Sequence, residues 1–291
     1  MNIQQRILDA QKPEAGFVPL LMGIVNVTPD SFSDGGMFLR PDAAIEHGVR
    51  LLDEGADIVD IGGQSTRPPG SDYGSGSQSV TTEEELQRVI PVIAGIAKLR
   101  PDATISVDTM KPQVAEAALE SGAAIINDVS AGQHDPAIWE VAARANAPYI
   151  LMHGHNPHHH RPAADYHYHD VVAHVAEWLA ERIALARQAG VKQVVADCGI
   201  GFAKGFQENC ELLRRHREFL ALGVPLLVGA SRKAFLGRIL GGVPPTQRLF
   251  GTLAAHHVAV ANGASIIRAH DVRAARDFFT VHATLSGLAV G

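Results

Sequence analysis

Short apolar runs alternate with longer segments of helical periodicity along almost the whole chain. The first run, residues 20–27, is nearly all apolar, rich in β-branched side chains and free of charge. This pattern is typical of a parallel strand that is covered on both faces. Seven more runs have strand length: 58–61, 104–107, 124–126, 149–152, 193–196, 226–229 and 265–267.

The segments between these runs predict helices. They span residues 42–54, 83–99, 112–121, 137–146, 169–189, 208–222, 246–262 and 272–288. Several carry end signals: Thr82 is suited to cap the second helix, whose first turn is acidic, and Gly122 and Gly190 stop two others.

Eight strand–helix units in succession predict an α/β fold, with a closed parallel (β/α)8 barrel of the TIM type as the expected architecture. The alternative is an open, doubly wound parallel sheet, but no Gly-x-Gly-x-x-Gly turn supports it. A chain of 291 residues can form one such domain, so we expect an N-terminal extension at 1–18 and a single barrel at 19–291.

Composition and charge exclude several classes of partner. The chain is 46% hydrophobic and 19% charged, which is typical of a globular protein, and no window reaches the ~18 apolar residues that a membrane span needs. The net charge of -6 and the scattered basic residues argue against nucleic acid. Two cysteines, Cys198 and Cys210, and no secretory signal in the first 16 residues favour the reducing cytoplasm.

Nearly every predicted strand ends in a polar or charged residue. They are Asn26, Thr66, Arg67, Asp108, Asn127, His153, Asp197, Lys233, Arg268 and His270. In a barrel the carboxyl ends of the strands meet on one rim, where the active site lies. The competing interpretation, that strand ends are polar because they meet water, suits a single residue better than eight units in a row.

The chemistry of this rim divides into two groups. Asp108, Asn127 and Asp197 offer the acceptors and the amide that match a flat heterocycle with an amino-pyrimidinone edge, since unmatched donors would be left unpaired. Lys233, Arg268 and His270 offer positive charge and donors suited to phosphate. We therefore expect a site that is acidic on one side, basic on the other, and binds a heterocycle bearing a pyrophosphate.

Seven motifs carry a family resemblance. They are the stretch 22–36, Asp-Ile-Gly-Gly-Gln-Ser-Thr-Arg-Pro at 60–68, Ser-Val-Asp-Thr at 106–109, Ile-Asn-Asp-Val-Ser at 126–130, Asp-Cys-Gly-Ile-Gly-Phe-Ala-Lys at 197–204, Ser-Arg-Lys at 231–233 and Arg-Ala-His-Asp at 268–271. In this order the chain resembles the dihydropteroate synthase family over residues 20–271. The resemblance implies condensation of 6-hydroxymethyl-7,8-dihydropterin pyrophosphate with p-aminobenzoate, giving 7,8-dihydropteroate and pyrophosphate in folate biosynthesis.

The resemblance also implies roles for individual residues. The pterin is held by Asp108, Asn127, Asp197 and Lys233. The pyrophosphate is held by Asn26, Thr66, Arg67, Arg268 and His270, with Mg²⁺ bound through Asn26. The p-aminobenzoate position is bordered by Phe32, Pro68, Phe202 and Ser231. The residues expected to be catalytic are Asp108, Lys233, Arg268 and His270, in a dissociative substitution that Mg²⁺ assists. Homodimers are common in the family, and the apolar faces of the last helices are the expected interface.

The chain departs from the family pattern at several positions. Gln64 replaces a usual Glu, Cys198 a usual Pro and Gly154 a usual Met. These changes leave open a pterin-binding homologue without synthase activity; a pterin-dependent methyltransferase is disfavoured because it leaves the pyrophosphate-binding cations unexplained. The long loop 69–82 suggests altered sulfonamide sensitivity, with a tolerated surface insertion as the competing interpretation. The His-rich segment 153–169 could suggest a metal site, but three consecutive histidines at 158–160 do not easily face one ion.

Overall fold

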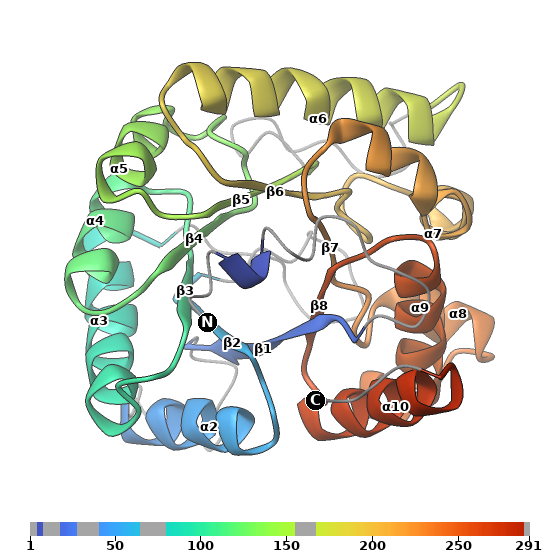
Figure 1. Ribbon diagram of the computed structural model, residues 1–291, viewed down its shortest axis with the longest axis horizontal. Coiled ribbons are helices and arrows are strands. Elements are labelled where there is room, and N and C mark those ends of the chain that lie inside the picture. Colours follow the sequence, from blue (N-terminus) through green and yellow to red (C-terminus); the bar gives the residue numbers. More distant parts are fainter. Residues whose placement is uncertain (1–4, 8–17, 28–40, 65–79, 155–166, 288–291) are drawn as a thin grey trace.

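Eight parallel strands close into a barrel in sequence order, from β1 to β8 (Figure 1). The computed structural model describes residues 5–7, 18–27, 41–64, 80–154 and 167–287. The strands are β1 (Leu20–Asn26), β2 (Ile58–Gly62), β3 (Ile105–Asp108), β4 (Ile125–Asp128), β5 (Tyr149–Met152), β6 (Val194–Asp197), β7 (Leu226–Val228) and β8 (Ile266–Ala269). Because β1 pairs with both β2 and β8, the sheet is closed, so the predicted (β/α)8 barrel is confirmed and the open sheet is wrong.

A ring of helices surrounds the strands (Figure 1). They are α2 (Pro41–Asp53), α3 (Thr82–Leu99), α4 (Pro112–Glu120), α5 (Ala137–Ala145), α6 (Val171–Gln188), α7 (Phe206–Arg214), α8 (Ala234–Ile239), α9 (Leu249–Ala261) and α10 (Val272–Leu285), with 3-10 turns η3 (His216–Leu222) and η4 (Pro245–Gln247). Among these described helices, none is both long and apolar enough to cross a membrane.

The structure differs from the predicted helices in four details. The expected single helix at 208–222 is two elements, α7 and η3, and the one expected at 246–262 begins only at Leu249, after η4. The short helix α8 was not predicted. The cap of α3 is Thr81 rather than Thr82: its Oγ1 accepts from the Glu84 amide at 3.2 Å, and its own amide donates to Glu84 Oε2 at 3.0 Å. This reciprocal pair is a capping box.

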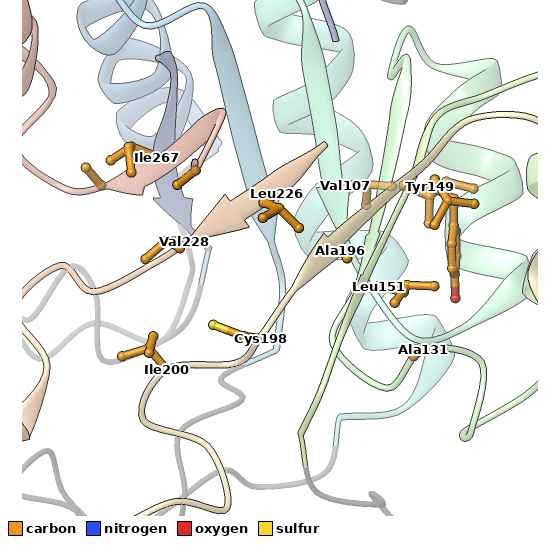
Figure 2. Packing of buried hydrophobic residues seen from close by; sticks show 14 of the residues in the cluster. Val107, Ala131, Tyr149, Leu151, Ala196, Cys198, Ile200, Leu226, Val228 and Ile267 are labelled. Carbon is orange, nitrogen blue, oxygen red and sulfur yellow. The ribbon is translucent and has the colours of Figure 1, made fainter. Parts of the chain in front are cut away.

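Two apolar layers stabilise the barrel. The larger lies between the strands and the helices, and Cys198 and Ile200, just past β6, continue it (Figure 2). The smaller fills the inside of the barrel with Ile7, Leu20, Met22, Ile58, Ile125, Ile150, Val195, Leu227 and Ile266. Apolar residues at or near the start of several strands thus pack the amino end of the barrel, which leaves the carboxyl end for polar chemistry.

The N-terminal segment contributes to that inner layer. Residues 5–7 form one helical turn, seen at the centre of the barrel in Figure 1. Ile7 is buried among the inner apolar residues, and Arg6 forms an ion pair with Asp57 just before β2. The boundary expected between an extension at 1–18 and a barrel at 19–291 stays a prediction.

Candidate active site

The predicted polar residues that the structure describes lie at the carboxyl ends of the strands, on one rim. The registers Asn26↔Gly62, Gly62↔Asp108 and Asp108↔Asn127 place these residues of β1 to β4 at one level. Asp197 ends β6, and Arg268 lies in β8. Lys233 follows β7 and begins α8 as its N-cap residue. The rim is therefore assembled from distant parts of the sequence, as the prediction required.

A buried network of two acids, an amide and an arginine occupies one part of the rim. Arg268 Nε donates to Asp60 Oδ2 at 2.7 Å, and Arg268 Nη2 donates to Asp108 Oδ2 at 3.0 Å. Asn127 Nδ2 donates to the same Asp60 oxygen at 3.0 Å. Asp60 is fully buried and was not among the predicted site residues. The sequence did carry a signal for Asp60: it is a single acid inside an apolar strand. A buried acid needs a hydrogen-bond or charge partner.

This network changes the expected division of charge. Arg268 was expected on a basic side facing phosphate, but its guanidinium lies between two carboxylates. The physical reason is Asp60, since a buried carboxylate requires a countercharge. Burial raises the pKa of the Asp108 carboxyl to about 7, and the negative charge of Asp60 adds to the rise while Arg268 opposes it. Asp108 can therefore change its charge near neutral pH.

A second group of contacts joins Asp197, Lys233 and Phe202. Asp197 Oδ1 accepts from the Gly199 amide at 2.7 Å. Lys233 Nζ donates to the carbonyl oxygen of Ile200 and lies 4.4 Å from the centroid of the Phe202 ring. Burial raises the pKa of Asp197, against the effect of the Lys233 ammonium. Burial also lowers the pKa of Lys233 to about 8, although Asp197 acts to raise it. Asp197 and Lys233 therefore each favour the charged form of the other in a poorly solvated place.

Ser231 and His270 form a third contact on the rim. Ser231 Oγ lies 2.9 Å from His270 Nδ1 and accepts from the His270 amide at 3.2 Å. The next residue of each motif forms a second contact: Arg232 Nε donates to Asp271 Oδ2 at 3.0 Å. The two motifs that follow β7 and β8 therefore hold one another in place.

With this geometry established, similar proteins can be compared. A family model described as pterin binding enzyme matches residues 22–270. The chain belongs to this family. A dihydropteroate synthase of Bacillus subtilis is 43% identical over 87% of this chain and 84% of its own length.

Two solved structures of Xanthomonas albilineans dihydropteroate synthase are also similar. One, with 4-aminobenzoic acid, has a TM-score of 0.84 and 44% identity, covering 93% of this chain and 94% of that one. The other, in complex with 7,8-dihydropteroate, has a TM-score of 0.82 and 42% identity, covering 95% and 97%. These matches confirm the predicted dihydropteroate synthase, the enzyme that joins a pterin pyrophosphate to p-aminobenzoate in folate biosynthesis.

Most residues assigned from the pterin-binding family lie within the described part of the chain. Asp108, Asn127 and Arg268 share the acid network, Asp197, Lys233 and Phe202 share the second group, and Ser231 and His270 the third. Asn26 is placed on the rim by β1, half-buried. Phe32, Thr66, Arg67 and Pro68 lie outside the described residues. Their predicted roles are therefore untested by the geometry.

The structure describes the surroundings of the three residues that depart from the family pattern. Cys198 is buried, and burial raises the pKa of its thiol to about 12, with Asp197 adding to the rise. Gln64 Oε1 accepts from Lys111 Nζ at 3.2 Å. The space beside Gly154 is approached by the end of the Met152 side chain. The loop 69–82 and the histidines at 158–160 fall largely or wholly outside the described residues.

Proposed function

We propose that the residues of the rim divide three tasks of dihydropteroate synthesis among them. Asp108, Asn127, Asp197 and Lys233 hold the pterin, Arg268 and His270 with Asn26 hold the pyrophosphate, and Phe202 and Ser231 border p-aminobenzoate. The observation that carries this proposal is that Asp197 and Lys233 both bond the backbone of residues 199–200, on the same rim as the Arg268–Asp108 pair. Together they offer acceptors for the amino-pyrimidinone edge and a donor for its carbonyl.

Arg268 can bond the two buried acids and the pyrophosphate at the same time. A guanidinium has five N–H donors, and the bonds to Asp60 and Asp108 use two of them. The remaining donors are available to phosphate oxygens at the same rim, where His270 also lies. The acids therefore orient Arg268 before substrate binds, and less reorganisation is needed when the pyrophosphate departs.

Asn26 suits the predicted role of Mg²⁺ ligand. Its amide oxygen is a hard donor placed at the rim by β1, and Mg²⁺ in such sites is held by few protein groups together with substrate phosphates. No group of three or more His, Cys, Asp or Glu that could hold a metal alone is found among the residues the structure describes. When bound, the ion neutralises the leaving pyrophosphate.

The bond-breaking step then follows from charge. As pyrophosphate leaves, positive charge develops on the pterin methylene and spreads into the ring. An ionised Asp108 on the pterin side stabilises that charge. p-Aminobenzoate attacks as a neutral aromatic amine, so no strong base is required. The reaction proceeds without a covalent intermediate on the enzyme.

An activity assay with one charge-removing variant tests this proposal. Wild-type protein with Mg²⁺, the dihydropterin pyrophosphate and p-aminobenzoate should form dihydropteroate and pyrophosphate in equal amounts. Asp197→Asn should lower kcat/KM about 100-fold, since a charged hydrogen-bond partner is worth about 1.5–3 kcal/mol. Asp277→Asn, an exposed acid on α10, is the control and should keep full activity. Unchanged activity in Asp197→Asn would contradict the assignment.

The quaternary structure is part of the proposal. Exposed apolar side chains lie at the end of α8 and on α9 and α10: Ile239, Leu240, Phe250, Val258, Val281 and Leu285. Phe250 and Leu285 are each 82% exposed, and such surfaces usually mark interfaces. A second copy of the chain would cover them. Phe250→Asp should convert a dimer to a monomer in light scattering, whereas Leu99→Asp, on α3, should not; a dimer that persists in the first variant would refute this interface.

Two further expectations concern the location of the protein and its inhibition. A cytoplasmic location is supported by the two unpaired cysteines, Cys198 and Cys210. Altered sulfonamide sensitivity is proposed for the long loop 69–82. Inhibition equal to that of a relative with a short loop would exclude it.

A further inference from the structure

The ammonium group of Lys204 is buried under the loop that joins β6 to α7. The residue is 4% exposed. Its Nζ lies 2.8 Å from the carbonyl oxygen of Phe202, 3.0 Å from that of Gly199 and 3.1 Å from that of His153. It also lies 2.9 Å from Nδ1 of the His153 ring. Four acceptors from two segments thus converge on one ammonium, which has three hydrogens to donate.

The loop above Lys204 has an unusual backbone. Gly199, Gly201 and Ala203 have φ values of 69°, 81° and 51°, in the left-handed region that costs about 1 kcal/mol or more for a residue with a Cβ. A Cβ at Gly199 would collide with the carbonyl oxygen of His153. Such a path persists only where surrounding contacts determine it. Lys204 supplies those contacts from inside.

Asn209, on α7, bonds the same loop. Its Oδ1 accepts from the Gly201 amide at 2.6 Å, and its Nδ2 donates to the Gly205 carbonyl at 2.6 Å. The loop is therefore bonded by two side chains, and neither Lys204 nor Asn209 was expected to act at the site. Neither side chain needs to contact a substrate to influence the rim.

The loop also supplies the backbone groups that bond Asp197 and Lys233, the two residues proposed to anchor the pterin. The Gly199 amide donates to Asp197 Oδ1 at 2.7 Å. The Ile200 carbonyl accepts from Lys233 Nζ, and the Phe202 ring lies 4.4 Å from that ammonium. The backbone that Lys204 bonds is thus the backbone that places the Asp197 carboxylate and the Lys233 ammonium. A shift of this loop would move both anchors together.

We propose that Lys204 is a positioning residue, which fixes the 199–204 loop so that Asp197 and Lys233 are preorganised for the pterin. The proposal rests on the function proposed for those two residues. The surroundings favour a role in positioning over one in stability. Burial lowers the pKa of Lys204 to about 7, with Cys198 and Asp197 opposing, so the charged form is disfavoured in the interior. Among the described residues Lys204 bonds carbonyl oxygens and a histidine nitrogen but no carboxylate, so removing its charge does not leave a bonded acid without its countercharge.

The test is Lys204→Met, which keeps the length of the side chain and removes its donors. Hydrogen exchange of the Gly199 and Gly201 amides should become at least about tenfold faster, as one lost hydrogen bond of about 1.4 kcal/mol allows. The dissociation constant and the KM for dihydropterin pyrophosphate should rise about 10–100-fold, more than the KM for p-aminobenzoate. Ile125→Val, at the amino end of the barrel, is the control for a loss of stability. It should leave the exchange rates, the dissociation constant and both KM values unchanged.

Additional variants keep the outcome decisive. Lys204→Gln retains two N–H donors and should have intermediate effects, and it replaces the Met variant if that one does not fold. Asn209→Ala should reproduce the faster exchange. Wild-type exchange and affinity in Lys204→Met would overturn the proposal, as would weak binding with unchanged exchange, which would make Lys204 a direct ligand. A wild-type protein without synthase activity would instead refute the proposed function, while the exchange results would still test the loop.

Discussion

Replacing Lys111 by methionine should destabilise the protein more than any exposed charge substitution. Lys111 Nζ donates to Glu85 Oε2 at 2.5 Å, to the Val80 carbonyl at 2.7 Å and to Gln64 Oε1 at 3.2 Å. The side chain of Lys111 is 10% exposed, and that of Glu85 is 1% exposed. The ammonium therefore bonds Gln64, Val80 and Glu85. The first two residues flank the segment 65–79, and Glu85 is a buried acid of α3.

The size of the effect follows from what is left behind. Lys111→Met leaves the Glu85 carboxylate buried without its countercharge, which costs about 3–5 kcal/mol. That is a large part of the roughly 5–15 kcal/mol by which proteins are usually stable. The double variant Lys111→Met/Glu85→Met removes both charges and should recover most of the loss, since apolar replacement of a buried pair is often neutral.

Urea unfolding at pH 7, monitored by circular dichroism, measures the four corners of this double-mutant cycle. Arg144→Met is the matched control, because Arg144 pairs with Glu116 at 2.9 Å on the surface, where the two side chains are 60% and 55% exposed. It should cost less than about 1 kcal/mol. A loss below about 1 kcal/mol for Lys111→Met, or a double variant no more stable than the single one, would refute the reasoning.

Three other predictions concern the rim and the segments that follow β6. If the ionised Asp108 and the charged Lys233 are both needed, kcat/KM should rise as pH increases through about 7, fall above about 8, and lose its acid limb in Asp108→Asn; a flat profile would contradict this. Ala203→Gly should stabilise the protein by about 0.5–1 kcal/mol in urea unfolding, because φ there is 51°; a loss of stability would refute the strain. A thiol reagent should modify Cys210 in the native protein but not the buried Cys198. Mass spectrometry after proteolysis identifies the modified cysteine, and modification of Cys198 would contradict this prediction.

The sequence predicted the barrel well because its signals are local. Each apolar run between helical segments is readable without knowing its neighbours, and the parallel arrangement follows from the alternation. Asp108 and Asp197 were found because they end strands. Lys233, just past β7, was found in the same way.

Other features depend on three-dimensional contacts that a linear pattern does not contain. Asp60 lies in the middle of β2 and belongs to the site only because Arg268 and Asn127 reach it across the barrel. Lys204 looked like the end of a motif, and the role proposed for it follows from the path of the 199–204 loop over it. The six-residue helix α8 was missed because its apolar residues directly follow a functional motif and leave no room for helical periodicity to show.

Pyrophosphate release from the dihydropterin pyrophosphate in the presence of Mg²⁺ is the most direct measurement of the central claim. It should be made with and without p-aminobenzoate, for the wild-type protein and for Lys233→Ala. The proposed mechanism predicts release by the wild type, dihydropteroate formation when p-aminobenzoate is present, and collapse of both in the variant. Wild-type rates in Lys233→Ala, or binding of the pterin substrate by the wild type without any release, would contradict it.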